Sequence, residues 1–508
     1  MAQPALLAIA GHDPSGGAGL GTDLATWQAM GLHGTSVCTA LTVQDQRGVH
    51  EVLPTPLATL RGALDAARSS VYPAAVKLGM LGSEAVAQEV ASFCEAQTVP
   101  VVWDTVLAAA AGGRSLLQAG GATLQRLARA ATVLTPNREE AASLLGVAPW
   151  PGSGAPPREW VQALRACWLQ QGRTRAVLLK GGHAEGSHSV DWLCTPDTVL
   201  ALAVPRLPPG AAGRVHGTGC VYASVVAGML AQGTDLVQAA VEAQWRTHAA
   251  IGHAWVAGGG RAMANPAACL DSAGFPQLQH AGFEAPRGDF APLLRDPGLY
   301  PVLPDADWVL RMLDLGVDTV QLRVKSLRGG ELRAQVRAAA DAARARGAQL
   351  FVNDHWREAL DAGAYGVHLG QEDLDLAAAQ LRALREAGLR LGVSAHNPAE
   401  MARAHALRPS YIALGPVWPT STKQLEHAPL GLSRLRAWTA RCKPRYPVVA
   451  IGGISLERAA AAMPCGVDGV AVIGAVVGAG DPGQAVRQGR EIVESALRLR
   501  RTAALAQP

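Results

Sequence analysis

A proline- and glycine-rich stretch, residues 271–297, divides the chain and most restricts how it can fold. It contains four prolines and three glycines, namely Pro276, Pro286, Pro292, Pro297, Gly274, Gly282 and Gly288. Proline fixes φ and removes a backbone donor, and glycine carries a high entropic cost inside regular elements. The few apolar residues of the stretch follow no period, so we interpret it as a linker between domains at residues 1–270 and 298–508.

Composition narrows the class of protein. Apolar residues make up 49% and charged residues 17% of the chain, which is typical of large folded cores. The net charge of +4 comes without a concentrated basic run, which argues against a nucleic-acid partner. The eight cysteines include no Cys-x-x-Cys pair, as expected in a reducing cytoplasm. No apolar run approaches the ~20 residues of a membrane span, so we expect small-molecule partners and no membrane. The sequence leaves the oligomeric state open and is compatible with a homo-oligomer.

The first half alternates short apolar runs with helix-like stretches, which predicts a doubly covered, mainly parallel α/β sheet. The runs are 5–10, 36–41, 75–78, 99–103, 131–134 and 176–179. In such sheets the functional site lies at the carboxyl ends of the strands. Gln44, Met80, Asp104 and Lys180 are among the residues expected there.

Two glycine-rich loops in this half have the strand–loop–helix context of anion sites. For the first, residues 11–19, a tight βα turn is the alternative. In the second, Gly217, Thr218 and Gly219 would present backbone N–H groups at a helix start, and Cys220 follows in the first turn. A helix N-terminus lowers the pKa of a thiol, so Cys220 could act as a base or stabilise an attacking hydroxyl. A small buried core residue is the alternative.

These motifs resemble those of hydroxymethylpyrimidine/phosphomethylpyrimidine kinases, in the ribokinase-like superfamily. The matching segments are 13–19, 40–44, 77–81, 135–140, 180–183 and 216–220. The resemblance implies that 4-amino-5-hydroxymethyl-2-methylpyrimidine and its monophosphate are phosphorylated by ATP, mainly through positioning and charge stabilisation. The residues it assigns are Gln44 for the aminopyrimidine edge, Gly11, Asp23, Met80 and Val106 around the ring, Asn137, Glu140, Lys180 and the loop Gly217, Thr218 and Gly219 for ATP phosphates, and Cys220 for catalysis. A pyridoxal-type kinase, which shares the Cys-ended motif, is the alternative.

In the second half the apolar runs follow one another at shorter and more regular intervals, which predicts a (β/α)₈ TIM barrel. The eight runs are 299–303, 319–324, 349–352, 366–369, 389–393, 411–414, 447–451 and 469–473. Polar residues follow seven consecutive runs. Arg323, Lys325 and Lys423 are suited to phosphate oxygens, and Asp354 and Asp373 are suited to Mg²⁺ bound to a diphosphate.

This half resembles thiamine-phosphate synthases through segments 321–325, 352–354, 368–373, 392–396, 415–416, 419–423 and 451–454. The resemblance implies that a pyrimidine diphosphate loses pyrophosphate and that a thiazole phosphate nitrogen then attacks, giving thiamine phosphate. The residues it assigns are Gln321, Leu322, Arg323, Val324, Lys325, Asn353, Ser394 and Lys423 for the diphosphate, Asp354 and Asp373 for Mg²⁺, and Thr420, Ser421, Thr422, Gly453, Ile473 and Gly474 for the thiazole phosphate. Val324 stands where the family commonly has Glu, and Gly474 where it usually has Ser. A barrel that binds these phosphates as a non-catalytic sensor is the alternative. The kinase product would be the synthase substrate, so the two resemblances agree.

Overall fold

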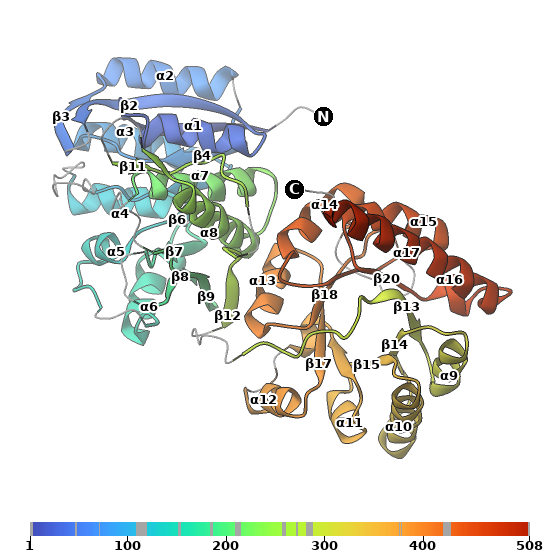
Figure 1. Ribbon diagram of the computed structural model, residues 1–508. Helices are drawn as coiled ribbons and strands as arrows, with labels where there is room; N and C mark the ends of the chain where they lie inside the picture. The colour runs from blue at the N-terminus through green and yellow to red at the C-terminus, as the bar shows by residue number, and fades with distance from the viewer. Residues whose placement is uncertain are drawn as a thin grey trace. The chain divides into compact units, whose positions relative to one another are not determined.

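The computed structural model describes residues 4–45, 48–70, 72–107, 119–150, 154–182, 186–208, 215–256, 261–270, 273–280, 288–374, 376, 378–419 and 428–505. The chain divides into two compact units, Met1–Glu284 and Ala285–Pro508 (Figure 1). Each unit has its own sheet and its own buried core.

The first unit is a three-layer α/β structure. Its strands are β1 (Ala5–His12), β2 (His33–Asp45), β3 (Gly48–Pro54), β4 (Ala75–Leu78), β5 (Val101–Trp103), β6 (Val133–Leu134), β7 (Ala176–Leu179), β8 (His188–Cys194), β9 (Val199–Pro205), β10 (Trp255–Val256), β11 (Ala262–Met263) and β12 (Gln277–His280). Its helices are α1 (Gly19–Ala29), α2 (Leu57–Ser70), α3 (Glu84–Glu95), α4 (Gly121–Ala130), α5 (Arg138–Leu145), α6 (Arg158–Leu164) with the π-helical turn η1 (Arg165–Leu169), α7 (Thr218–Ala231) and α8 (Leu236–Gly252).

Ten of these strands form one sheet in the order β12-β9-β8-β7-β6-β5-β4-β1-β2-β3. The six strands predicted from the sequence, β1, β2, β4, β5, β6 and β7, are all present and parallel. Strands β3, β8, β9 and β12, which pair antiparallel with their neighbours, are not predicted from the sequence. Helices α1, α7 and α8 pack together on one face of the sheet, and α2, α3 and α4 pack in succession (Figure 1). Alternate strand residues therefore reach opposite cores: Leu7 and Ile9 of β1 belong to the core that also contains residues of α2, α3 and α4.

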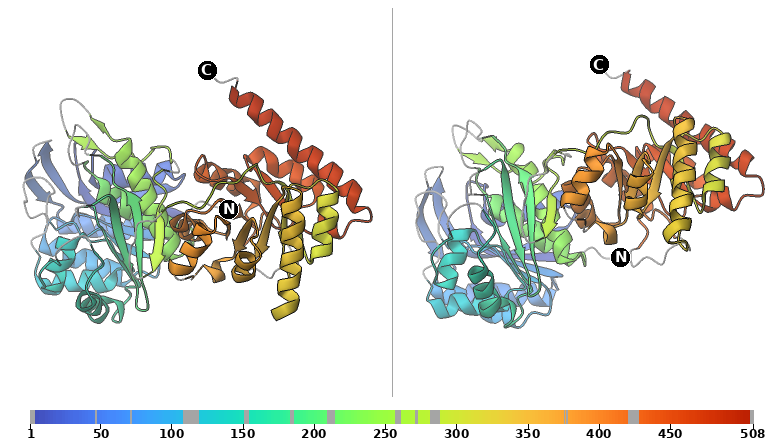
Figure 2. Two further views of the ribbon diagram at one scale, coloured as in Figure 1. Left: turned by 60° about the horizontal axis from the view of Figure 1, so that its bottom comes forward. Right: turned by 90° about the horizontal axis from the view of Figure 1, so that it is seen from below.

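The second unit is a closed barrel of eight parallel strands, β13 to β20. The strands are β13 (Gly298–Leu303), β14 (Thr319–Leu322), β15 (Gln349–Asn353), β16 (Gly366–Leu369), β17 (Arg390–Ala395), β18 (Tyr411–Leu414), β19 (Val448–Ala450) and β20 (Gly469–Val472). The helices, which lie outside the strands (Figure 2), are α9 (Ala306–Asp314), α10 (Gly329–Ala345), α11 (Trp356–Asp361), α12 (Ala378–Glu386), α13 (Pro398–Leu407), α14 (Gly431–Cys442), α15 (Leu456–Ala462), α16 (Gly474–Val477) and α17 (Pro482–Leu505), with short 3₁₀ turns η2 (Gln371–Asp373) and η3 (Met463–Cys465). All eight predicted barrel strands are confirmed, with end points that differ by at most two residues.

Large aromatic residues fill the barrel interior. Tyr300, Phe351 and Tyr411 are buried there with smaller residues of β13, β18, β19 and β20. The Phe351 and Tyr411 rings meet edge to face with centroids 5.0 Å apart, a favoured geometry for aromatic pairs. The interior is therefore a packed core and not a channel.

The stretch interpreted as a linker is partly built into both units. Strand β12 lies within it and pairs with β9 at the edge of the large sheet. Residues 288–297, called the floor segment below, run across the amino ends of the barrel strands. Its contacts there are Phe290 N to Arg408 O (3.0 Å), Leu294 N to Tyr365 Oη (2.8 Å) and Gln349 Oε1 (3.1 Å), and Ser410 Oγ to Ala291 O (2.6 Å). The spacing of apolar residues does not reveal these elements, because each is short and is stabilised by pairing with distant parts of the chain.

Among the parts of the chain that the structure describes, no helix has the length and apolar character needed to cross a membrane.

Candidate functional sites

The carboxyl ends of β1, β4, β5, β6 and β7 meet at one edge of the first unit, as predicted. Lys180 and Asp104 form an ion pair there, with Nζ and Oδ1 2.9 Å apart. Burial by itself lowers the pKa of Lys180, but the carboxylates of Asp104 and Glu140 outweigh it, and the net shift is upward. Lys180 is therefore a fixed positive charge at the strand ends. Asp104 follows β5 in the predicted region but is absent from the assigned set.

Asn137 and Glu140 form a capping box at the start of α5. The Glu140 N–H donates to Asn137 Oδ1 (2.8 Å), and the Asn137 N–H donates to Glu140 Oε2 (2.9 Å). Thr105 Oγ1 also donates to Glu140 Oε2, over 3.0 Å. Burial raises the pKa of the Glu140 carboxyl, against the lowering effect of Lys180. The structure thus brings Glu140 to the Lys180–Asp104 pair and gives Asn137 a capping role.

The glycine loop before α7 closes over this charged pair. Gly217 has φ 81°, and a Cβ there would collide with the carbonyl oxygen of Gly17, so the two glycine loops touch. A Cβ on Gly219 would lie 3.3 Å from Asp104 Oδ2 and 3.4 Å from Lys180 Nζ. The backbone N–H groups at the start of this 14-residue helix are therefore beside Lys180, which suits an anion such as phosphate.

Cys220 lies at this helix start, but its expected low pKa is wrong. Burial raises the pKa of the thiol to about 12, although the Lys77 ammonium group acts in the opposite direction. The nearby carboxylates of Asp23 and Asp104 add to the upward shift. The thiol is only 9% exposed, so desolvation of a thiolate outweighs the favourable field of the helix end. Cys220 is accordingly a neutral thiol in this structure.

Asp23 is enclosed and does not reach the surface of the site. Its two carboxylate oxygens lie 2.8 and 2.9 Å from Lys77 Nζ, and Ser224 Oγ donates to Oδ1 over 2.8 Å. Both members of the ion pair are 0% exposed. The expectation that Asp23 surrounds a ligand ring is therefore not met by this arrangement. The sequence signal for its partner was a lysine within the otherwise apolar strand β4.

Four other residues assigned to the pyrimidine lie at the carboxyl ends of the neighbouring strands β5, β4, β1 and β2. A Cβ on Gly11 would lie 3.1 Å from Met80 Cε, so these two residues are neighbours. Val106 follows Asp104, and its N–H donates to the Asp104 carbonyl over 2.8 Å. Gln44 is placed near the end of β2, with its side-chain Nε2 atom 3.4 Å from His216 Nε2.

In the barrel, Asp354 and Asp373 meet at the carboxyl ends of β15 and β16. Asp354 has φ 63°, a rare conformation for a residue other than glycine, and its N–H donates to His368 O over 3.0 Å. Burial, and then the Asp373 carboxylate, raise the pKa of Asp354 to about 6, while Arg323 opposes the shift. Two carboxylates this close together are suited to a divalent cation, which relieves their repulsion.

Mg²⁺ commonly takes one or two protein carboxylates and completes its shell with water and substrate phosphates. The pair Asp354 and Asp373 fits that pattern. No group of three or more His, Cys, Asp or Glu side chains suited to a metal occurs within the described ranges, so a closed all-protein site is not present there.

A hydrogen-bonded chain of buried side chains crosses the barrel below these carboxylates. Gln321 Nε2 donates to Tyr300 Oη (3.2 Å), and the Tyr300 and Tyr411 hydroxyls are 2.9 Å apart. His368 Nδ1 lies 2.7 Å from Tyr411 Oη, and its Nε2 lies 2.8 Å from Ser394 Oγ. Burial lowers the pKa of His368 to about 3, so the imidazole is neutral. The chain links two assigned residues, Gln321 and Ser394, through tyrosines that the sequence analysis missed.

Other assigned barrel residues differ in accessibility. Leu322 is 0% exposed and Val324 is 7% exposed, so their side chains offer a ligand little surface. Arg323 is half-buried and Lys325 is exposed, and Asn353 at the end of β15 is 8% exposed.

The structure describes only some of the residues assigned to the thiazole phosphate. A Cβ on Gly453 would lie 2.6 Å from Pro419 O, which shows a close approach of two strand-end loops. Ile473 and Gly474 begin α16 after the last strand. Thr420, Ser421, Thr422 and Lys423 lie outside the described residues.

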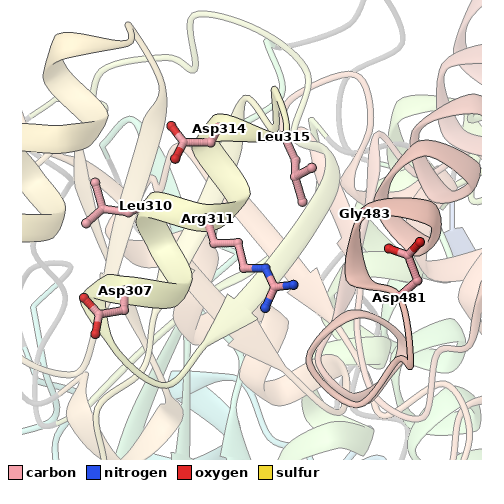
Figure 3. A pocket seen from close by; sticks show the side chains of 7 residues that line it. All are labelled: Asp307, Leu310, Arg311, Asp314, Leu315, Asp481 and Gly483. Atoms are coloured by element: carbon pink, nitrogen blue, oxygen red, sulfur yellow. The ribbon is translucent and has the colours of Figure 1, made fainter.

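A depression of about 580 Å³ lies on the outside of the barrel (Figure 3). It is lined by Asp307, Leu310, Arg311, Asp314, Leu315, Asp481 and Gly483. None of these residues belongs to the candidate sites, so the depression has no part in them.

Fold and sites together define a two-domain enzyme with a doubly covered sheet of kinase type and a phosphate-handling TIM barrel. The family model for phosphomethylpyrimidine kinase matches residues 13–265, and that for thiamine monophosphate synthase matches residues 299–476. A thiamine-phosphate synthase of Neisseria meningitidis serogroup A is 50% identical over 198 residues, which are 39% of this chain and 95% of that protein. The chain belongs to the thiamine-phosphate synthase family through its barrel and carries a phosphomethylpyrimidine kinase domain before it, which makes it a bifunctional enzyme of thiamine biosynthesis.

Two solved structures resemble the first unit. A phosphomethylpyrimidine kinase from Clostridium difficile is 28% identical with a TM-score of 0.41, covering 49% of this chain and 100% of that one. A pyridoxal kinase from Staphylococcus aureus, solved with AMP-PCP and pyridoxal, is 26% identical with a TM-score of 0.47, covering 56% and 100%.

Proposed function

We propose that residues 1–270 phosphorylate 4-amino-5-hydroxymethyl-2-methylpyrimidine and then its monophosphate, with ATP as donor. Residues 298–508 then join the resulting diphosphate to a thiazole phosphate, releasing pyrophosphate and forming thiamine phosphate. One observation carries the proposal. Each family model matches one structural unit, and the strand ends of that unit carry charged side chains suited to binding phosphate or its metal ion.

In the kinase unit, the Gly217–Gly219 loop and Lys180 hold the ATP phosphates. The support is the close approach of Gly219 to Lys180 and the orientation of the helix dipole of α7. Gln44, Gly11, Met80 and Val106 hold the pyrimidine ring. Catalysis then comes from alignment of the hydroxymethyl group with the γ-phosphate and from neutralisation of charge, since phosphoryl transfer needs little covalent help.

In the synthase unit, Arg323 and Lys325 contact the diphosphate, and Asn353 and Ser394 position the pyrimidine. Asp354 and Asp373 would hold Mg²⁺, which supplies positive charge to a departing pyrophosphate. The neutral His368 holds Ser394 Oγ in place from within the barrel. Gly453, Ile473 and Gly474, with the segment 420–423, hold the thiazole phosphate.

The test supplies the full chain with the hydroxymethylpyrimidine, ATP, Mg²⁺ and the thiazole phosphate, and follows products by mass. Formation of thiamine phosphate, dependent on every component, is the expected result. Pyridoxal added as a competitor is expected to leave the rate nearly unchanged. Phosphorylation of pyridoxal in preference to the pyrimidine would refute the kinase half of the proposal, and binding of the diphosphate without turnover would refute the synthase half.

A further inference from the structure

His216, which directly precedes the glycine loop 217–219, is held firmly between two loops. Its N–H donates to Ala262 O (2.8 Å), and its carbonyl accepts from the Ala264 N–H (2.9 Å). Its ring packs against Gly17, where a Cβ would lie only 2.8 Å from His216 Cδ2. The imidazole therefore has little freedom to move away from its partners.

One of those partners is Asp13, which fixes the position of the imidazole proton. Its Oδ2 atom lies 3.0 Å from His216 Nε2, and its Oδ1 accepts from the Ser15 N–H (2.9 Å) and Oγ (2.7 Å). Burial would raise the pKa of Asp13, but these hydrogen bonds lower it overall, so the carboxyl is ionised at neutral pH. An ionised carboxylate at this distance requires a hydrogen on Nε2, which becomes a charge-assisted donor.

The same nitrogen faces the side-chain amide of Gln44 at 3.4 Å. Because Nε2 carries a hydrogen, it has no lone pair for an amide N–H, and two donors facing each other repel. The oxygen and nitrogen of an amide are assigned from such networks. The favourable arrangement therefore turns Gln44 Oε1 toward His216 and leaves its NH₂ group farther away. A β-bulge between Val43 and Gln44 aims the side chain out of the regular strand pattern.

The order of acceptor and donor on Gln44 selects one orientation of the substrate. A 4-aminopyrimidine presents an amino donor beside a ring-nitrogen acceptor, and the amino carbon is the neighbour of the carbon that bears the hydroxymethyl group. With the Gln44 acceptor on the His216 side, the amino group binds on that side. The hydroxymethyl group is then brought toward Gly217–Gly219, where the phosphate is expected. The reverse order would turn it away.

We infer that His216, oriented by Asp13, is a positioning residue that sets the Gln44 amide and thereby the productive orientation of the aminopyrimidine. This inference rests on the proposed kinase function and adds to it the residue that determines the orientation in which the aminopyrimidine ring binds.

The test compares His216→Phe with the matched control His33→Phe, an exposed histidine at the opposite end of β2. Full-length protein is assayed with the hydroxymethylpyrimidine and with its 4-desamino analogue. His216→Phe is expected to lower kcat/KM for the aminopyrimidine by about tenfold, the effect of one polar contact. The loss should be clearly smaller with the desamino analogue, which keeps only the contact between the Gln44 NH₂ group and the ring nitrogen. The KM for ATP and the synthase activity should stay unchanged. His33→Phe should behave as wild type.

A double-mutant cycle with Gln44→Ala separates positioning from loop structure. If His216 acts through Gln44, adding His216→Phe to Gln44→Ala costs nothing more. A further fall in the double variant, or an equal loss with the desamino analogue, would overturn the inference while the proposed function stands.

Asp13→Asn provides a second variant that does not remove the ring. Asn can accept from Nε2 or donate to it, so the imidazole proton is no longer fixed, and kcat/KM should fall between wild type and His216→Phe. A wild-type value in Asp13→Asn would also overturn the inference. A wild-type enzyme that fails to phosphorylate the aminopyrimidine would instead refute the proposed function.

Discussion

Phe290 tests whether the floor segment is part of the barrel or only a connection to it. Its ring is 3% exposed, and the Arg385 guanidinium carbon lies 4.5 Å from the ring centroid. The perturbation is Phe290→Ala, which removes the ring and leaves the backbone bond to Arg408 in place. If the segment were a free linker, this change would have no effect on barrel stability.

The expected magnitude follows from burial. A phenylalanine removes ~150–200 Å² from water, worth about 4–5 kcal/mol at ~25 cal/mol per Å². Residual burial in the unfolded chain reduces this by about a quarter, to roughly 3 kcal/mol, the lower end of typical Phe→Ala costs. For a domain of roughly 200 residues, each kcal/mol shifts Tm by about 2–4 °C, so a fall of about 6–12 °C is expected.

The assay is thermal unfolding of the full chain, followed in parallel by residual synthase and kinase activity after heating. Synthase loss should shift to lower temperature in Phe290→Ala, while kinase loss stays at the wild-type temperature. Leu294→Ala is the matched control, because Leu294 lies in the same segment but is 69% exposed, and it should change Tm by about 1 °C or less. Equal shifts in the two variants would refute the reasoning.

Three further outcomes are expected. Iodoacetamide should alkylate Cys220 more slowly than the exposed Cys269 at pH 8, since burial raises the Cys220 pKa to about 12; faster modification of Cys220 by peptide mass analysis would restore a thiolate role. Asp373→Asn should raise the Mg²⁺ concentration for half-maximal synthase rate by roughly tenfold and leave the kinase rate unchanged, because one of the two carboxylates proposed to hold Mg²⁺ is lost; an unaltered Mg²⁺ titration would contradict this. Asp191 is 5% exposed, and burial raises its pKa from 3.8 to about 6. A raised pKa gives stability that is present below pH ~4 and lost as pH rises through ~6, about 3 kcal/mol in all, so Asp191→Asn should stabilise the first unit at pH 7 but not at pH 4. Urea midpoints at both pH values measure it.

The fold was predictable where a strand is buried on both faces and separated from the next by a helix. The barrel strand 366–369 and the sheet strand 75–78 have the same bounds in the sequence analysis and in the structure. Strands β8 and β9 were missed because they follow one another directly as an antiparallel pair, without an intervening helix to mark them. Strand β12 was missed because its four residues carry no period of their own and form only by pairing with β9.

The site was predictable as far as strand ends determine which residues meet. Lys180 and Glu140 lie with the glycine loop because parallel strands place their carboxyl ends at one edge. The state of Cys220 could not be inferred in this way, because the helix end is visible in the sequence and the burial of the thiol is not. Tyr300 and Tyr411 were missed for a related reason. Each lies within an apolar run, where only the three-dimensional structure distinguishes a hydrogen-bonded hydroxyl from simple packing.

In both units the cationic side chains proposed to bind phosphate lie close to protein carboxylates. Lys180 is paired with Asp104 in the first unit, and Arg323 lies in the field of Asp354 in the second. A free cation of this kind would be mobile and strongly hydrated, whereas a paired one is already oriented and partly desolvated. The carboxylates, however, also repel an incoming phosphate, so binding requires that their charge be offset. In the barrel the second carboxylate, Asp373, raises the pKa of Asp354 and makes the pair a better ligand for a divalent cation than either residue alone. The cation and the diphosphate are therefore expected to strengthen each other's binding, since each removes the repulsion that the other meets.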